Sequence, residues 1–344
     1  MIKSSTVEFF ISSCYCKIMK KQRKYAGIDK ELKLLGLMRY KDMGPLMFLA
    51  SEAMAALTVA FLRVPRHIKR TKFMINGYRG EPVRVTFYQP KEIPDNAPCL
   101  IYFHGGGFAM REFGLHHKLM FEYAARTPCK VAFVHYRLAH KHPFPCAVED
   151  GYNALVWMRD NAAQLGIDPG KIVVGGDSAG GALAAALSLM ARDRKGPKIN
   201  FQMLLYPVID NSLSSRSIAE LVDCPMCNPL MLKQMWETYL RDGDFGTPQY
   251  ASPMRAKSLA GLPPAYIETE EFDSLKDEGK AYAERLSEDG VGVKLNEMQG
   301  TFHAFDTLYK SKIAKKAIMQ RIDALKAANS NLVTVGSEQL KEKK

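Results

Sequence analysis

Short apolar runs alternate with longer amphipathic stretches from about residue 72 to the C-terminal part of the chain. Apolar runs of a few residues predict β-strands, and apolar residues at helical spacing predict helices. The predicted strands are Lys72–Ile75, Val83–Tyr88, Cys99–Phe103, Val131–Tyr136, Ile172–Val174, Phe201–Tyr206, Ala265–Glu268 and Val293–Glu297. The predicted helices are Phe113–Arg126, Val148–Leu165, Ala179–Arg192, Ser274–Glu288 and Ala304–Lys326. This alternation predicts an α/β fold, with a mostly parallel central sheet covered by helices on both faces.

Two segments lie outside this alternation. The stretch from Val208 to Ser258 is rich in Met and Pro, contains Trp236, and is interpreted as an insertion between two sheet strands. Leu46–Leu62 is apolar, and five Lys and Arg residues follow it within ten positions. In a soluble enzyme we expect such a segment to be a buried helix; a helix lying on a membrane surface is the alternative interpretation.

Composition and charge narrow the range of partners. The 344 residues are 47% hydrophobic and 24% charged, the balance of a soluble globular chain, and the net charge is +12. The excess of Lys and Arg over Asp and Glu is nine in residues 1–70 and six in residues 310–344, whereas residues 71–309 carry three more acids than bases. Because the basic ends carry no zinc-finger, RRM or KH signature, no nucleic-acid partner is expected.

Cysteine usage favours a reducing compartment. The chain holds seven cysteines at irregular spacing, an odd number that does not suit a secreted disulfide framework. Cys224 and Cys227 form a CxxC pair, but no second pair or matched histidines follow it, so we expect two ordinary thiols and no metal. The N-terminal residues make a poor signal peptide, and a cytoplasmic location is expected.

Gly176-Asp177-Ser178-Ala179-Gly180 reads GxSxG and lies between a predicted strand and a predicted helix. A nucleophile elbow needs this context, because its turn is so tight that the residues flanking the serine must be small. The serine hydroxyl would then stand at a helix N-terminus, where positive partial charge favours a developing oxyanion. The motif alone is of moderate specificity, since such a turn can also be structural or bind a phosphate. It lacks the lysine of a P-loop.

His104-Gly105-Gly106-Gly107 follows the predicted strand Cys99–Phe103. Three glycines leave the backbone amides free to point at one spot, as in the HGGG oxyanion loops of esterases and lipases. Together with the amide of Ala179, this loop would supply three donors to a tetrahedral intermediate. His104 precedes the glycines and lies upstream of the serine, so we expect an architectural role for it rather than that of a base.

The base and the acid of a catalytic triad can be inferred from their order along the chain, which in this topology is Ser, acid, His. Of eight histidines only His303 follows Ser178, so His303 is the expected general base. The acid should follow the predicted strand Ala265–Glu268, where Glu270, Glu271 and Asp273 are the candidates. We favour Asp273, which would open the next helix; a plain helix N-cap is its alternative role.

These motifs together resemble the hormone-sensitive lipase family of α/β-hydrolases, the type IV or α/β-hydrolase-3 esterases. The matching stretches are His104–Phe108, Tyr136–Pro145, Gly176–Gly181, Glu271–Gly279 and Gly300–Phe305. The resemblance implies an α/β-hydrolase fold with a helical cap, Asp273 as the acid, and the amides of Gly106, Gly107 and Ala179 as oxyanion donors. Two departures exist, because His140-Lys141 and Ser274 stand where the family usually has Pro-Glu and Pro.

The resemblance also implies a domain division. Residues 1–70 would hold an N-terminal extension of about 18 residues and cap helices, residues 71–327 the catalytic domain, and residues 328–344 a polar tail. The 208–258 insertion would complete the cap. The methionines of both cap segments suit a deformable acyl pocket, although simple core packing is the better explanation for most of them.

The resulting hypothesis is a serine carboxylesterase that hydrolyses short-chain acyl esters through a Ser178–His303–Asp273 triad, without cofactor or metal. Amide hydrolysis or deacetylation on the same fold is the alternative reaction. A non-catalytic ligand-binding member of the family is the alternative class, although relatives of that kind have lost the histidine that is present here as His303. The expected partner is a small-molecule ester, and the expected state is a monomer or homodimer. Membrane-surface association is not favoured, because the basic ends are interpreted as solvated helix faces.

Overall fold

The computed structural model describes residues 25–40 and 42–330. An eight-stranded sheet runs through the described part of the chain in the order β1-β2-β4-β3-β5-β6-β7-β8. Its strands are β1 (Ile68–Asn76), β2 (Pro82–Pro90), β3 (Ala97–Phe103), β4 (Lys130–His135), β5 (Ile167–Asp177), β6 (Phe201–Leu205), β7 (Ala265–Glu270) and β8 (Val293–Met298). The pairs β1–β2 and β2–β4 are antiparallel, and all others are parallel. The predicted α/β fold is confirmed.

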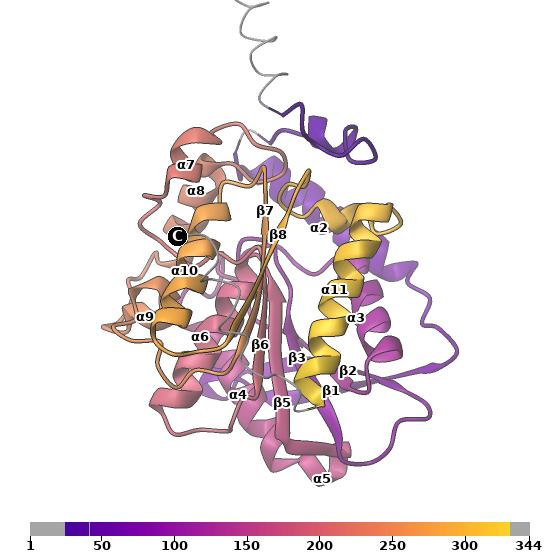
Figure 1. The fold of residues 1–344 in the computed structure, drawn as a ribbon. Helices are drawn as coiled ribbons and strands as arrows, with labels where there is room; N and C mark the ends of the chain where they lie inside the picture. Colours follow the sequence, from indigo (N-terminus) through magenta and orange to yellow (C-terminus); the bar gives the residue numbers. More distant parts are fainter. Residues whose placement is uncertain (1–24, 41, 331–344) are drawn as a thin grey trace, which may run out of the picture.

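Helices cover both faces of this sheet (Figure 1). One apolar core joins one face to α4 (Cys146–Asp160), α6 (Ala179–Asp193) and α10 (Lys276–Glu288). A second core joins the other face to α3 (Gly114–Arg126) and α11 (Lys312–Asn329). Strands such as β3, whose last five residues are buried, are apolar on both sides because they pack between two helical layers.

The remaining helices are short apart from α2 (Pro45–Ala60). The described insertion folds into α7 (Arg216–Glu220), α8 (Pro229–Tyr239), α9 (Pro248–Ala251) and the 3-10 turn η3 (Pro253–Arg255). Three further pieces are η1 (Leu35–Leu37), η2 (Tyr78–Gly80) and α5 (Ala162–Leu165). The helices α2, α7 and α8 lie at the upper end of the sheet in Figure 1.

Two predicted helices are each divided. The predicted helix Val148–Leu165 is divided at Asn161 into α4 and α5. The predicted helix Ala304–Lys326 is a 3-10 turn, η4 (Phe305–Leu308), followed by α11. Ser311 begins α11 by accepting a hydrogen bond from the Ala314 amide at 3.3 Å. A serine that caps a new helix also ends the preceding one, because its backbone is extended.

The expectation of a buried helix at residues 46–62 is wrong. The helix forms as α2, but Ala55 is its only buried side chain among those described, while Leu49 is 70% and Leu57 54% exposed. The helix packs on the start of α3 near Gly114, and Phe48 contacts the ring of His140. Apolar composition predicted the helix correctly, but the number of neighbours that cover it is decided by the fold. The predicted N-terminal extension and most of the predicted polar tail lie outside the described residues.

Candidate active site

Ser178 stands at the turn between β5 and α6. Its backbone adopts φ 55° and ψ −119°, a strained conformation for a residue with a side chain. A side chain at Gly176 would place its Cβ 2.3 Å from the Gly180 backbone, and one at Gly180 would come within 2.1 Å of the Phe103 carbonyl oxygen. Only glycine therefore fits on either side, as the GxSxG pattern predicted. The Ser178 amide donates to the Leu205 carbonyl at 2.8 Å, which holds the turn against β6.

His303 and Asp273 meet Ser178 in one chain of hydrogen bonds. Nε2 of His303 lies 3.0 Å from the Ser178 Oγ, and Nδ1 lies 2.7 Å from Oδ2 of Asp273. Asp273 is fully buried, and both Ser178 and His303 are 7% exposed. The three loops meet because they follow the parallel strands β5, β7 and β8, whose carboxyl ends share one edge of the sheet.

The surroundings of His303 favour its charged form. Burial lowers the pKa of this imidazole, but the nearby charge of Asp273 and its hydrogen bond outweigh burial and raise the pKa above its ordinary value. The second oxygen of Asp273, Oδ1, accepts from the Leu275 amide at 3.0 Å. Asp273 therefore orients the imidazole ring of His303, and the Leu275 amide in turn holds the Asp273 carboxylate in place.

The three acid candidates have three different environments. Asp273 faces His303, but it does not open α10, which begins three residues later after Leu275. Glu271 accepts a hydrogen bond from the Gly300 amide at 2.7 Å, and so ties the acid loop to the histidine loop. Glu270 is fully buried, and its two oxygens have no hydrogen-bond partner among the described residues. Burial and the charges of Glu268 and Asp273 raise its pKa well above the usual range, which favours its neutral form.

The glycine loop after β3 is anchored through Asp177. The Gly105 amide donates to Oδ2 of Asp177 at 3.0 Å, and the Tyr102 hydroxyl donates to Oδ1 at 2.9 Å. The amides of Gly106 and Gly107, like that of Ala179 at the start of α6, donate to no acceptor among the described residues. These amides remain available to a ligand.

His104 has the structural contacts expected of a packed side chain. Its ring stacks on Tyr136 with centroids 4.5 Å apart, and its Nδ1 lies 2.7 Å from the Gly105 carbonyl oxygen. Burial lowers its pKa to about 4, so the ring is neutral at ordinary pH. Hydrogen bonding to Ser178 Oγ comes from His303, not from His104.

Side chains from both predicted cap segments lie close to the glycine loop. A Cβ at Gly107 would lie 3.2 Å from Cε of Met43, which precedes α2, and 3.4 Å from Cγ of Met235 on α8. The next residue, Phe108, stacks on Tyr239 of α8 with centroids 3.9 Å apart. Both predicted cap segments thus contribute to the roof of the site.

A buried ionic cluster behind His303 was missed in the sequence. Arg321 of α11 is fully buried and donates to Asp306 at 2.6 Å and to both oxygens of Glu268 at 3.1 and 3.2 Å. The Tyr206 hydroxyl donates to Asp306 at 3.0 Å, and its ring packs edge-on against His303. The available signal was an arginine within the apolar stripe of the last helix, beside Ile318, Ile322 and Leu325.

The CxxC pair and the described acids form no metal site. Cys224 and Cys227 are free thiols, and burial, together with the nearby Asp273, raises the pKa of both. Within residues 25–40 and 42–330, no group of three or more His, Cys, Asp or Glu side chains is arranged to hold a metal ion.

Comparison with known proteins gives one consistent result. A profile of a family described as having the alpha/beta hydrolase fold matches residues 100–307. Esterase LipI of Mycobacterium tuberculosis is 35% identical over 78% of this chain and 86% of its own length. Carboxylesterase NlhH of the same organism is 36% identical over 81% of this chain and 88% of its own. A solved bacterial heroin esterase is 33% identical, has a TM-score of 0.82, and covers 89% of this chain and 99% of its own. The chain therefore belongs to the α/β-hydrolase family, as its resemblance to the hormone-sensitive lipases and type IV esterases predicted.

Proposed function

We propose that the protein is a serine carboxylesterase that hydrolyses short-chain acyl esters through an acyl-enzyme. The observation that carries this proposal is the continuous line of hydrogen bonds from Asp273 through His303 to Ser178. A carboxylate that orients an imidazole towards a strained, helix-capping serine is the arrangement that activates a hydroxyl as a nucleophile. The names of the relatives, which are esterases and carboxylesterases, support the same reaction class.

In the proposed mechanism, Nε2 of His303 accepts the proton of the Ser178 hydroxyl as Oγ attacks the ester carbonyl. The amides of Gly106, Gly107 and Ala179 stabilise the resulting oxyanion. His303 then gives its proton to the leaving alcohol, and the acyl group remains on Ser178. A water molecule, deprotonated by His303, attacks the acyl-enzyme, and the acid leaves as Ser178 recovers its proton.

The short-chain preference rests on the roof of the site. Met43 and Met235 approach the glycine loop within van der Waals contact of a Cβ at Gly107, which restricts the space above the oxyanion donors. Methionine side chains adapt their shape, so the limit would be graded rather than absolute. The proposed domain division follows the same geometry: the described parts of residues 1–70 and 208–258 form the cap, and the residues between and after them form the catalytic unit.

A chain-length series of p-nitrophenyl esters, from acetate to palmitate, tests the proposal, together with the matching p-nitroanilides. We expect kcat/KM to be highest for short acyl groups and to fall as the chain lengthens, with anilides far slower. Higher turnover of anilides than of esters would instead identify an amidase. Binding of esters without turnover of any of them would identify a non-catalytic member of the family, and either result would contradict the proposal.

A further inference from the structure

The helix α2 is apolar over most of its surface, and its most exposed residues are all apolar. Eight residues project from it on one side with their side chains exposed, and all eight are apolar; we call them the outer face of α2. They are Leu49, Ala50, Ala53, Met54, Ala56, Leu57, Ala60 and Phe61. Their spacing follows the 3.6-residue period of a helix, so they form one continuous stripe along its length.

The polar side chains of α2, Ser51, Glu52 and Thr58, lie off this stripe. Thr58 accepts a hydrogen bond from the Gly114 amide at 3.0 Å, and Ser51 donates to the Phe48 carbonyl at 2.8 Å. Glu52 lies 3.8 Å from the Arg111 guanidinium. A surface helix of a soluble protein normally presents its polar residues to water. Because the outer face contains no polar side chain, it is suited to an apolar surrounding.

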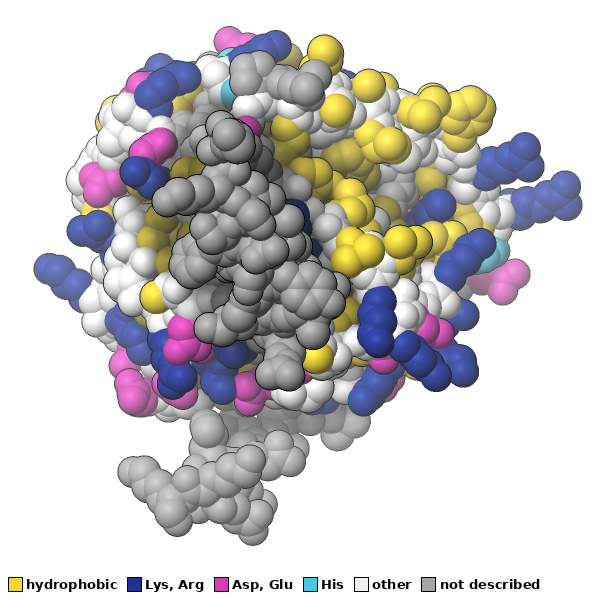
Figure 2. Space-filling model, turned by 90° about the horizontal axis from the view of Figure 1, so that it is seen from above, with side chains coloured by type: hydrophobic (Ala, Val, Ile, Leu, Met, Phe, Trp, Pro, Cys, Tyr) yellow, Lys and Arg dark blue, Asp and Glu magenta, His cyan; other side chains and the backbone are white. Residues whose placement is uncertain are grey.

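The outer face of α2 exposes more apolar surface than single, scattered apolar residues would. Leu49 is 70% and Phe61 77% exposed, with Met54 and Leu57 above one half. Figure 2 shows hydrophobic side chains gathered on one side of this end of the molecule, with Lys and Arg side chains projecting at the edge. The outer face runs over thirteen residues, from Leu49 to Phe61, so at 1.5 Å each the stripe is about 20 Å long. Contiguous patches of this kind mark interaction surfaces.

The charge of the neighbouring residues indicates which kind of partner fits the outer face of α2. Arg63 and Arg66 follow the C-terminal end of α2 in the segment before β1; both are exposed, and neither forms an ion pair with a described carboxylate. Residues 53–80 contain no Asp or Glu. A second copy of the chain would bring a second set of these cations. The N-terminal residues 1–24, with six Lys and Arg and one Glu, are cationic as well. An anionic lipid surface complements both the apolar stripe and the cations.

We propose that the outer face of α2 binds the surface of an anionic lipid bilayer, with the helix lying in the plane of the interface and Arg63 and Arg66 contacting lipid phosphates. In-plane helices with an apolar face and flanking Lys and Arg bind in this way. Among the described residues, no helix has the length and apolar composition needed to cross a bilayer. Docking here would bring the roof of the candidate active site, which includes Met43, close to the lipid surface.

Vesicle co-sedimentation of the full chain tests the proposal. Vesicles of phosphatidylcholine alone are compared with vesicles that contain about one third phosphatidylglycerol, at low and at physiological salt. We expect binding to the anionic vesicles that weakens with salt, and little binding to the neutral ones. Replacing two anchors together, Leu57→Ser and Phe61→Ser, should lower the partition coefficient by about tenfold or more. Replacing Arg63 and Arg66 by Ser should lower it by about tenfold on anionic vesicles.

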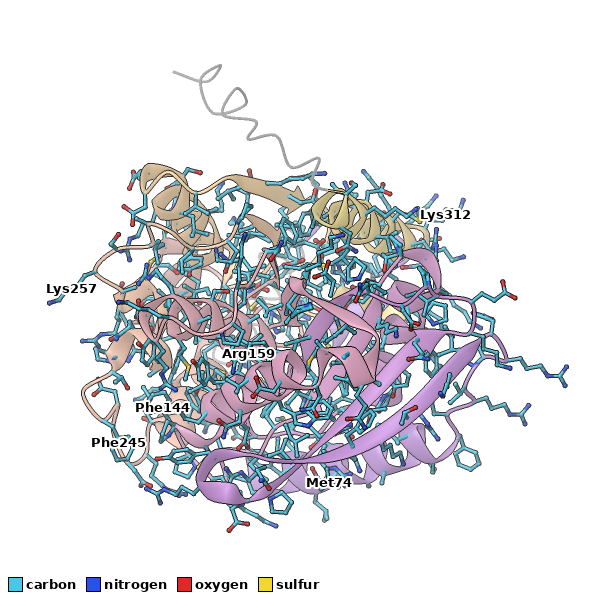
Figure 3. The ribbon with its side chains drawn as sticks, turned by 90° about the horizontal axis from the view of Figure 1, so that it is seen from below. Met74, Phe144, Arg159, Phe245, Lys257 and Lys312 are labelled. Atoms are coloured by element: carbon cyan, nitrogen blue, oxygen red, sulfur yellow. The ribbon has the colours of Figure 1, made fainter. Side chains whose placement is uncertain are left out.

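Matched controls lie far from α2 in the sequence. Phe245 is 64% exposed, and Lys257 is exposed as well; Figure 3 labels both on the margin of the molecule, with Lys257 projecting outward. Phe245→Ser and Lys257→Ser should bind vesicles as the wild type does. Melting temperatures close to the wild type establish that each variant is folded. This readout does not depend on esterase activity, so the proposed function and the lipid proposal can fail separately.

Three results would overturn the proposal. The first is no binding of the wild type to anionic vesicles at low salt. The second is equal binding by the folded Leu57→Ser/Phe61→Ser variant. The third is a wild-type dimer in sedimentation velocity that this variant converts to monomer, because the occupant of the outer face would then be a second copy of the chain.

Discussion

The polar cluster around His303 and the outer face of α2 depart from the usual distribution of side chains in opposite directions. Around His303, charged groups such as Asp273 and Arg321 are fully buried, yet each has hydrogen-bond partners. On α2, apolar side chains such as Phe61 are exposed. Burying charge and exposing apolar surface both cost free energy, so each region indicates a task other than stability alone. The first suits chemistry on a small molecule, and the second suits a partner surface.

The largest expected effect is on the nucleophile. Ser178→Ala should lower kcat/KM for a short-chain p-nitrophenyl ester by about five to six orders of magnitude, because the hydroxyl is the attacking atom. Ser188→Ala is the matched control: Ser188 is also buried on α6, and its Oγ donates only to the Ala184 carbonyl. Activity that survived Ser178→Ala would show that Ser178 and the polar cluster around His303 do not carry out the reaction.

Asp273→Asn should lower kcat by about 10⁴-fold, because an amide favours the wrong imidazole tautomer and removes the charge that stabilises the protonated ring. Glu270→Gln is the comparison, since the raised pKa of Glu270 favours its neutral form and its oxygens have no partner among the described residues. Steady-state kinetics on one ester should separate the two. Similar losses in both variants would contradict the assignment of Asp273 as the acid.

Arg321→Met should lower the free energy of unfolding by about 3–5 kcal/mol, because it leaves Glu268 and Asp306 as buried charges without their cation. Urea denaturation measures this change. The exposed ion pair of Arg241 with Asp242 is the control, and Arg241→Met should change the free energy of unfolding by less than about 1 kcal/mol. Equal effects would mean that burial does not distinguish the two pairs.

The pH profile tests the electrostatics of the same cluster. The base must be neutral to accept a proton, so activity is lost as the pH falls through the pKa of His303. Because Asp273 raises that pKa, the acidic limb of kcat/KM should have its midpoint above the ordinary imidazole value of about 6.5. A midpoint below that value would mean that burial outweighs the charge of Asp273.

The smallest effect is expected on the outer face of α2. Leu57→Ser should change the free energy of unfolding by less than about 0.5 kcal/mol, since the side chain is 54% exposed. Leu155→Ala, in the fully buried core of α4, should cost about 2–5 kcal/mol in the same urea experiment. A large loss at Leu57 would show that the outer face is held by contacts within the chain.

Much of the fold was predictable because its signals are local. Each predicted strand is present, although β1 and β5 are longer than their apolar centres, since ladder hydrogen bonds extend into polar flanks. The glycines around Ser178 were predictable for the same reason, because a tight turn leaves room for nothing larger. The division of the last predicted helix at Ser311 was missed: amphipathic spacing continues across the cap.

The residues that position the site were harder to predict. Glu271 was considered only as a candidate acid, and its contact with the Gly300 amide joins two loops that are distant in the sequence. Arg321 lies in an apolar stripe, but nothing along the chain indicates that Glu268 and Asp306 surround it. Such pairs depend on which strands become neighbours, and residue types alone do not determine that.

By itself, the sequence determined the strand–helix alternation, the turn that must carry Ser178, and the single histidine available after it. These follow from backbone sterics and chain order, which act over a few residues or by elimination. Only the tertiary structure decided that Glu271 accepts from the Gly300 amide, that Glu270 is buried without a hydrogen-bond partner among the described residues, and that α2 presents apolar side chains to solvent. Those outcomes depend on burial and on contacts between distant segments, and both arise only when the sheet and its helices pack together.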